Sequence, residues 1–237
     1  MFFKLLMTFF VASMVVESID TNKIIPTYQN WSNSIYEQLE SDNVLTLYFQ
    51  NWKPLGSLQI KYPEDRLVEL GNYLSPLETS SIPIEFTFKS FTPITKQFKK
   101  EYYSITLTDL DSNPGDGGSY SYEKCHSIWQ NLKFNEDDFT IIENPDDKKS
   151  FITTFDITSF QKSQLMEYIG PGPKPNTDVH RYVFILFRQP FGKLPNHKLR
   201  FRERWGSKYE GHGVEDWANY YGLKPIAINY FKSSNED

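Results

Sequence analysis

Cysteine is almost absent from this chain of 237 residues, which contains only Cys125. A single cysteine cannot form a disulfide within the chain, so a packed core must supply the stability of the fold. The neighbouring His126 could activate the thiol. A small buried apolar role is nevertheless the favoured interpretation of Cys125, because free cysteine is among the most buried residue types.

An excess of positive charge is also absent. The 25 basic and 30 acidic residues give a formal net charge of −5 and are mixed along the chain. A nucleic-acid-binding surface needs a stripe of lysine and arginine side chains that neutralises successive phosphates. We therefore do not expect nucleic acid as a partner.

Two signatures of hydrolytic enzymes are missing, since the sequence contains neither a Gly-x-Ser-x-Gly turn nor a His-Glu-x-x-His helix. These motifs carry the nucleophile of many hydrolases and the zinc ligands of many metalloproteases. We therefore predict no catalytic residue, no metal and no cofactor. A weaker enzyme hypothesis stays open, in which Asp109, His126 and His180 act as general acid and base or as metal ligands.

No apolar run is long enough for a comfortable membrane span. Residues 1–16 read MFFKLLMTFFVASMVV, one lysine followed by about a dozen apolar residues, which is typical of a secretory signal and short for a spanning helix. We predict a signal peptide over residues 1–18 and an extracellular or vacuolar destination. An uncleaved membrane anchor and a buried N-terminal helix are the alternatives. The sequon at Asn30 predicts glycosylation, which fits the secretory route.

Aromatic residues are abundant: 39% of the residues are hydrophobic and 16% are aromatic, a composition that favours a large core and β-strands. Short apolar runs separated by Pro, Gly, Asn and Asp predict an all-β fold, two-sheet or barrel-like. The run at residues 181–187 is apolar on both faces and predicts a central strand. The predicted strands are residues 44–49, 84–88, 103–108, 127–132, 182–187 and 226–231.

The predicted organisation is one domain over residues 44–231. An N-terminal extension, residues 19–43, precedes it and contains a short amphipathic helix with Trp31, Ile35 and Leu39 at steps of four. A second short helix is predicted at residues 214–221, ended by Gly222. Residues 232–237 form a polar tail.

Three polar groups mark the ends of predicted strands: Asp109 with Asp111, then His126, and then the segment 180–182. Period-two alternation places His180 and Tyr182 on one face of their strand and Arg181 on the other. We expect His180 and Tyr182 to line a cavity and Arg181 to pair with Asp111. Two loops are predicted, at residues 111–119 and at residues 170–176. Backbone N–H groups of the second loop could complete a pocket for phosphate or carboxylate.

Four stretches of the sequence resemble the phosphatidylethanolamine-binding protein family. Residues 168–183, YIGPGPKPNTDVHRYV, align without a gap with the family's Tyr-x-Gly-x-Gly-Pro-Pro-x-Gly-Thr-Gly-x-His-Arg-Tyr-Val. Residues 109–114 are similar to its Asp-Pro-Asp-x-Pro motif, residues 125–131 to a histidine-containing strand, and residues 221–227 to the approach to its last strand. The resemblance covers roughly residues 44–231.

The resemblance implies a β-sandwich with a few short peripheral helices and a small pocket for an anion such as phosphate or a phospholipid headgroup. Carried over by position, the ligand-binding residues are Asp109, His126, Gly172, Pro173, His180 and Tyr182. The sequence departs from the family pattern at Leu110 and Cys125, and at Lys174, Asn176 and Asp178, which replace a proline and two glycines. These changes allow the loop backbone to differ.

The resemblance implies a non-catalytic binding module. The long N-terminal portion looks more like fungal members, which include the inhibitor of carboxypeptidase Y. The alternative function is therefore inhibition of a serine carboxypeptidase through a protein interface, using residues 19–40 as well as the pocket. The expected partners are an anionic small ligand or headgroup, or a serine carboxypeptidase or other signalling enzyme.

Overall fold

The computed structural model describes residues 28–45, 52–91, 95–112, 122–134, 140–143, 149–154, 160 and 162–235, with the backbone alone at residues 28–31, 140–143 and 149–154. The predicted signal peptide lies outside the described residues, as do the side chain of Asn30 and most of the predicted loop at 111–119. Within the described ranges, no helix is long and apolar enough to cross a bilayer.

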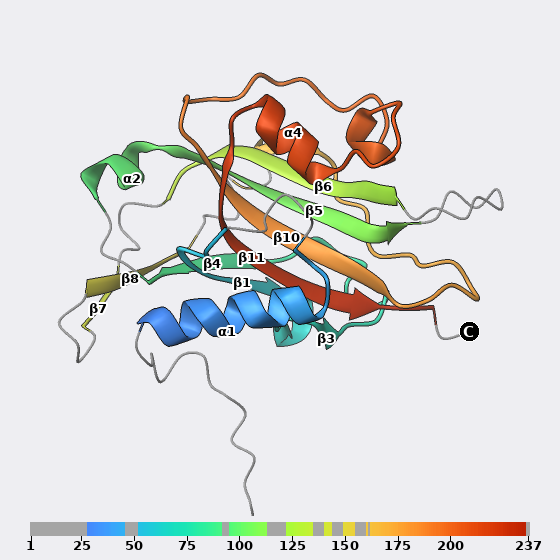
Figure 1. Cartoon of the computed structure of the whole chain (residues 1–237), viewed down its shortest axis with the longest axis horizontal. Helices are drawn as coiled ribbons and strands as arrows, with labels where there is room; N and C mark the ends of the chain where they lie inside the picture. The colour runs from blue at the N-terminus through green and yellow to red at the C-terminus, as the bar shows by residue number, and fades with distance from the viewer. Residues whose placement is uncertain are drawn as a thin grey trace, which may run out of the picture.

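Two β-sheets form the body of the fold (Figure 1). Among the described residues, one sheet has five strands in the order β2-β1-β4-β8-β7 and the other has six in the order β3-β11-β10-β5-β6-β9. Neighbouring strands are antiparallel except β11 and β3, which pair in parallel. The prediction of a mainly β fold with few helices is confirmed.

The strands are β1 (Gly56–Tyr62), β2 (Arg66–Val68), β3 (Asn72–Tyr73), β4 (Glu85–Ser90), β5 (Tyr102–Ser112), β6 (Tyr122–Leu132), β7 (Thr140–Glu143), β8 (Lys149–Thr154), β9 (Gln164–Met166), β10 (His180–Gln189) and β11 (Lys224–Ser233). The α-helices are α1 (Tyr28–Ser41), α2 (Lys96–Lys100) and α4 (Val214–Tyr220).

Strand β10 lies inside the six-stranded sheet, between β11 and β5, as its doubly apolar sequence predicted. Its alternate side chains enter two different cores. Phe184 and Leu186 belong to the core shared by the two sheets, whereas Ile185 and Phe187 belong to a second core on the opposite face. Burying each large apolar side chain contributes about 1.5–3 kcal/mol to the free energy of folding, so β10 stabilises both cores.

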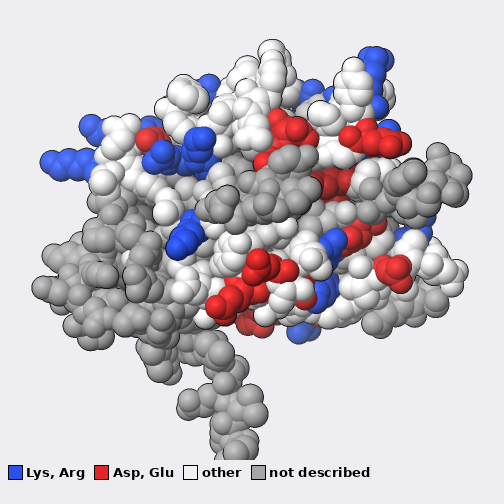
Figure 2. All heavy atoms as spheres, in the orientation of Figure 1, with Lys and Arg blue, Asp and Glu red and all other residues white. Residues whose placement is uncertain are grey.

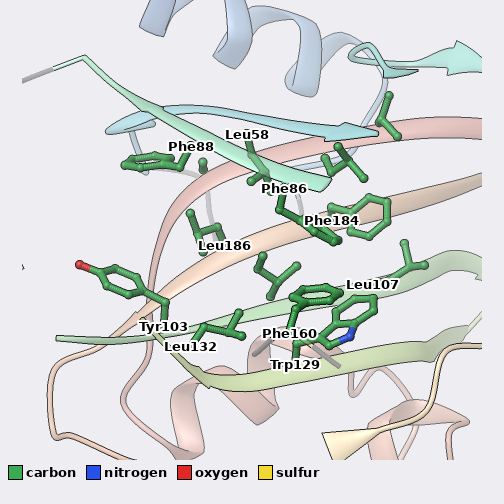
Figure 3. Close-up of a cluster of buried hydrophobic side chains, with 14 of the residues drawn as sticks. Leu58, Phe86, Phe88, Tyr103, Leu107, Trp129, Leu132, Phe160, Phe184 and Leu186 are labelled. Atoms are coloured by element: carbon green, nitrogen blue, oxygen red, sulfur yellow. The ribbon is translucent and has the colours of Figure 1, made fainter. Parts of the chain in front are cut away.

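The core between the two sheets is rich in aromatic rings (Figure 3). Phe86 of β4 meets Trp129 of β6 at a centroid distance of 5.6 Å and Phe184 of β10 at 5.7 Å. These tilted and edge-on contacts link the smaller sheet to the larger one and stabilise the core beyond the area that each ring buries. Many of the Phe and Tyr side chains of the sequence therefore lie in the core between the two sheets.

The second core is covered by helices α1 and α4. Ile35 and Leu39, one turn apart on α1, are buried against the six-stranded sheet, as are Val214 and Trp217 of α4. The predicted amphipathic helix is therefore confirmed, although it begins at Tyr28 and ends at Ser41. Helix α4 ends as predicted, because Gly222 adopts a φ of +64° that side chains rarely tolerate.

Three boundaries differ from the sequence prediction. Strand β11 continues to Ser233, inside the predicted polar tail, because Ser233 and Lys232 pair with His180 and Arg181 on β10. Val44 and Leu45 are not part of a strand, and residues 46–49 of that predicted strand lie outside the described residues. The first predicted loop cannot begin at residue 111, since β5 extends to Ser112.

Candidate functional site

A cavity of about 420 Å³ opens at the end of the six-stranded sheet where β5 ends and β10 begins. β5 supplies Asp109, β6 supplies His126, and β10 supplies His180 and Tyr182. Register explains this convergence, because Asp109 lies directly opposite Tyr182 on β10 and opposite Lys124 on β6. Residues distant in sequence therefore share one face of three adjacent strands.

Asp109 organises the polar side of the cavity and is only 3% exposed. Its Oδ1 accepts a hydrogen bond of 2.9 Å from the backbone N–H of Asp111. Its Oδ2 lies 2.9 Å from Nδ1 of His180 and 3.9 Å from Nε2 of His126. The carboxylate is thus held by β5 itself and is hydrogen-bonded to one histidine but not to the other.

His126 is fixed by the loop that follows β9. Its Nδ1 lies 2.9 Å from the carbonyl oxygen of Ile169, and its own carbonyl oxygen accepts a 3.0 Å hydrogen bond from the Ile169 N–H. Burial lowers the pKa of His126 to about 4, although the charge of Asp109 opposes this shift. His126 is therefore a neutral imidazole near pH 7.

His180 has the opposite electrostatic character. Burial by itself would lower the pKa of His180, but the hydrogen bond to Asp109 and the negative charges of Asp109, Asp111 and Asp178 outweigh it and raise the pKa. Because Asp109 binds Nδ1, the remaining ring nitrogen, Nε2, is left for a ligand. Of the two histidines of the cavity, His180 is the one placed to present a positive charge.

Tyr182 lies between the two histidines. Its ring meets His126 edge-on at a centroid distance of 5.2 Å and stacks with His180 at 6.3 Å. Burial raises the pKa of its hydroxyl above the ordinary range, and the charge of Asp109 adds to this effect. Within the described part of the chain, the Tyr182 hydroxyl and Nε2 of His126 are buried without a hydrogen-bond partner.

Arg181 points away from the cavity and pairs with Asp111. Its Nε and Nη2 donate to the two carboxylate oxygens at 2.8 and 2.6 Å, and its backbone N–H donates to the same carboxylate at 2.9 Å. Its Nη1 donates to the carbonyl oxygens of Asp42 and Asn43, just beyond α1. The planar guanidinium group of arginine can donate two parallel hydrogen bonds to one carboxylate, whereas the ammonium group of lysine cannot.

Most sequence-predicted ligand residues line this cavity: Asp109, His126, Gly172, His180 and Tyr182. Pro173 is buried and is not among the lining residues. Cys125 is fully buried, and burial raises the pKa of its thiol, so the structure favours the apolar interpretation.

The sequence analysis missed three residues. Lys124 lies two positions before His126, so period-two alternation alone could have found it. Glu203 reaches the cavity from a distant segment that forms a single bridge with Lys124, and no local pattern marks it. Arg202 donates to the carbonyl oxygens of His126 and Glu167 and so holds the loop against β6.

The charges around the cavity nearly balance. The lining residues include two basic side chains, Lys124 and Lys174, and two acidic ones, Asp109 and Glu203. The protonation of His180 therefore decides whether the cavity carries a net positive charge. In the face shown in Figure 2, basic side chains gather mainly near α2, whereas acidic side chains lie over α1 and also around α4. Among the described residues, no group of three His, Cys, Asp or Glu could hold a metal ion.

Fold and site together define a two-sheet β protein with a small polar cavity at the strand ends of the larger sheet. The family model described as phosphatidylethanolamine-binding protein matches residues 64–231. The chain therefore belongs to the phosphatidylethanolamine-binding protein family, and the resemblance seen in the sequence motifs is confirmed.

Two curated relatives are from Saccharomyces cerevisiae. The chain is 28% identical over 200 residues to the carboxypeptidase Y inhibitor, across 76% of this chain and 85% of that protein. It is also 28% identical over 204 residues to the uncharacterized protein YLR179C, across 84% of this chain and 90% of that protein.

Two solved structures share the fold. The carboxypeptidase Y inhibitor complexed with its cognate proteinase matches with a TM-score of 0.71 and 24% identity, covering 87% of this chain and 97% of that chain. The phosphatidylethanolamine-binding protein from Plasmodium vivax matches with a TM-score of 0.56 and 18% identity, covering 89% and 98%. At these identities the likeness concerns the fold alone.

Proposed function

We propose that this protein is a non-catalytic binding protein whose cavity takes a phosphate-type anionic group, either free or as part of a phospholipid headgroup. One observation carries the proposal: His180, oriented by Asp109, lines one cavity with His126 and Tyr182, and each of these two residues has a buried polar atom without a hydrogen-bond partner among the described residues. Buried polar groups without a partner are costly and are usually satisfied by a ligand or by water.

The cavity's chemistry supports an oxyanion over a purely apolar ligand. Protonated His180 would attract the negative charge, and the Tyr182 hydroxyl stays protonated and so adds no negative charge of its own. Gly172 is exposed at the rim, and an added Cβ there would meet no atom within 4 Å, so a ligand can approach its backbone closely. The volume of about 420 Å³ is within the usual range for small-molecule pockets.

Calorimetric titration of inorganic phosphate and O-phosphoethanolamine tests this function. We expect binding to the wild-type chain and at least about tenfold weaker binding to His180→Gln, because the variant cannot carry the positive charge. The matched control is His197→Gln, an exposed histidine outside the cavity, which should bind as the wild type does. Absence of any saturable binding to the wild type would refute the proposal.

A second candidate function is inhibition of a serine carboxypeptidase. The observation that favours it is the 28% identity over 200 residues to the carboxypeptidase Y inhibitor. In this hypothesis the N-terminal segment contributes to the interface. Helix α1 packs on the second core through Ile35 and Leu39, so a truncation that tests the segment must keep the chain from Tyr28 onward.

Inhibition of purified carboxypeptidase Y by the chain beginning at Ile19 and by the chain beginning at Tyr28 tests the second function. Strong inhibition that is lost in the shorter chain would place the interface in residues 19–27. Equal inhibition by both chains would move the interface to the folded domain. No inhibition by either chain at micromolar concentration would leave the binding function alone.

A further inference from the structure

Glu215, in the first turn of α4, carries a buried carboxyl group with few hydrogen-bond partners. The residue is 6% exposed, and its Oε2 has no partner among the described residues. Its Oε1 accepts a long hydrogen bond of 3.5 Å from the Asn219 side chain. Each oxygen of an ionised carboxylate needs donors, so a negative charge at this position is costly, whereas a protonated carboxyl group is much less so.

A second carboxyl group, that of Glu123 on β6, lies against the same turn of α4. Its Oε2 accepts hydrogen bonds from the Val214 N–H at 2.8 Å and from the Thr108 hydroxyl at 3.3 Å. An added Cβ at Gly213 would lie 2.2 Å from the Glu123 carboxyl carbon, so this carboxyl group fills the space at the start of the helix. Because Glu215 directly follows Val214, the two carboxyl groups meet at one helical turn.

The other charged groups near this turn supply no positive charge to the two glutamates. Asp216 adds a third carboxylate, which accepts a hydrogen bond from the Gly213 N–H at 3.2 Å and lies 3.3 Å from Nδ1 of His212. Among the described residues, neither Glu123 nor Glu215 forms an ion pair. The remaining charged residues next to Glu123 and in the segment before α4 line the cavity, contact other groups or are exposed: Lys124, Arg202, Glu203, Arg204, Lys208 and Glu210. Since no group of three His, Cys, Asp or Glu in the described ranges could hold a metal ion either, a proton is the means of neutralising Glu215.

The two glutamates lie beside the second core, which residues 204–220 cover. Trp205 and Trp217 of this segment are buried in that core. The Trp205 indole N–H donates to the Thr108 hydroxyl at 2.9 Å, and the same hydroxyl donates to Glu123. The carboxyl groups and the buried rings therefore belong to one connected structure, so a change of charge at the start of α4 affects the packing of the whole segment.

We propose that Glu215 is the titrating group of a pH-dependent switch, which holds residues 204–220 on the second core while its carboxyl group is protonated and lets them open when it ionises. An ionised Glu215 needs water, and it reaches water only if the first turn of α4 leaves the sheet. Glu123 and Asp216 favour this opening because they add negative charge at the same turn. The switch is separate from the anion cavity, and its test uses no ligand.

The direction of the pH dependence follows from the burial of Glu215. Burial raises the pKa of Glu215 from the ordinary 4.5 to about 7, and the charges of Asp216 and Glu123 act in the same direction. Burial also raises the pKa of Glu123. The advantage of the closed form is therefore complete below pH 4.5 and is lost as the pH rises through 7. With these two values, the equilibrium constant for opening rises roughly fiftyfold between about pH 5 and pH 8.

Amide hydrogen exchange of residues 214–220 measures this opening. After correction for the intrinsic pH dependence of exchange, the protection of these amides should fall roughly fiftyfold from about pH 5 to pH 8 in the wild-type chain. Glu215→Gln, which has nearly the same shape and cannot ionise, should lose most of this fall, and Glu123→Gln added to it should remove the rest. The matched control is Glu210→Gln, an exposed glutamate of the same segment, which should keep the wild-type response.

The amides of residues 183–187 in β10 serve as the reference for unfolding of the whole chain. Equal protection of α4 at both pH values in the wild type, or a fall that Glu215→Gln retains, would overturn the proposal. A fall of the same size in β10 would also overturn it, because the whole fold would then open instead of one segment. If Glu215→Gln does not fold, carbon-13 NMR of the wild-type Glu215 carboxyl group decides the question: a titration midpoint near 7 supports the switch, and one near 4.5 refutes it.

Discussion

At the scale of single residues, the two histidines of the cavity show how the hydrogen-bond partner of a ring and its burial set the chemistry of that ring. His126 hydrogen-bonds to a carbonyl oxygen and is buried, so its pKa falls to about 4. His180 hydrogen-bonds to a carboxylate, and its pKa rises. The same residue type therefore supplies a neutral ring at one position and a positive charge at another, on either side of the same carboxylate.

The buried neutral His126 predicts a pH dependence of folding stability. Its pKa is about 4 in the folded chain, against 6.5 as the ordinary value, so the unfolded state binds more protons between these pH values. The stabilising contribution is complete above pH 6.5 and is lost as the pH falls to 4, with a total of about 3 kcal/mol.

Denaturant unfolding of the wild type and of His126→Gln from pH 7.5 to pH 4 measures this contribution. The difference in unfolding free energy between the two chains should shrink as the pH falls through this window. His180 contributes with the opposite sign, because its raised pKa stabilises the fold at low pH, but it does so in both chains. Parallel pH profiles would contradict the assignment of His126 as a buried neutral ring.

Two glycines of the cavity loop, Gly170 and Gly172, differ in how much room a side chain would have. An added Cβ at Gly170 would lie 3.1 Å from the carbonyl oxygen of Thr79 and 3.2 Å from Cα of Ser80, whereas at Gly172 it would meet nothing within 4 Å. Gly170→Ala should therefore lower the free energy of unfolding by about 1–3 kcal/mol, the usual cost of overpacking against backbone. Gly172→Ala should stay within about 0.5 kcal/mol of the wild type. Chemical denaturation checks both, and equal stability of the two variants would contradict the contact.

At the scale of elements, α1 is tied to the strand that carries the cavity residues. The carbonyl oxygens of Asp42 and Asn43, after the helix, accept hydrogen bonds from Arg181 at 2.8 Å. The Asp42 carboxylate accepts hydrogen bonds from Tyr230 and Lys232 of β11, and the bond to Lys232 contributes most to the lowered pKa of Asp42. Helix α1 thus belongs to the folded body of the chain.

The packing of α1 predicts that substitutions on its buried face destabilise the fold, whereas substitutions on its exposed face do not. Leu39 is fully buried in the second core, whereas Glu37 is exposed on the opposite side. Leu39→Ala should lower the free energy of unfolding by about 2–5 kcal/mol, and Glu37→Ala should change it by less than about 0.5 kcal/mol. Hydrogen exchange should show faster opening of residues 28–41 in Leu39→Ala alone. Unchanged exchange there would mean that α1 does not depend on this core.

At the scale of the whole molecule, β10 joins two cores that lie on opposite faces of one sheet. Phe184 and Phe187 are each fully buried, the first between the sheets and the second under the helices. Because both side chains leave the same strand, neither core can lose its packing without affecting the other. We therefore expect the two cores to unfold together.

Phe184→Ala and Phe187→Ala test this cooperativity. Each should lower the free energy of unfolding by about 3–5 kcal/mol and shift one common thermal transition in scanning calorimetry. Ile185→Val, which removes one methylene from the second core, serves as the mild control at about 0.5–1.5 kcal/mol. Two separate transitions in either alanine variant would show that the cores are independent units.

Much of the fold was predictable from local pattern. The central position of β10, the amphipathic α1 and the end of α4 at Gly222 all follow from side-chain periodicity or from one backbone conformation. Strands β1, β7 and β8 were not among the predicted strands, and neither were the short strands β2, β3 and β9, whose three residues or fewer leave no periodic signal. They form because a neighbouring strand offers unpaired backbone groups.

The sequence by itself determined which residue types could build the site: the motifs fixed Asp109, His126, His180 and Tyr182 as candidates, and alternation placed Arg181 on the opposite face. Only the tertiary structure decided their chemistry. Lys124 and Glu203 join the cavity through strand register and a distant segment, and Arg202 of that segment holds the cavity loop against β6. The difference between a neutral His126 and a positively charged His180 depends on which acceptor each ring meets and how deeply it is buried, and these depend on contacts between segments far apart in the chain.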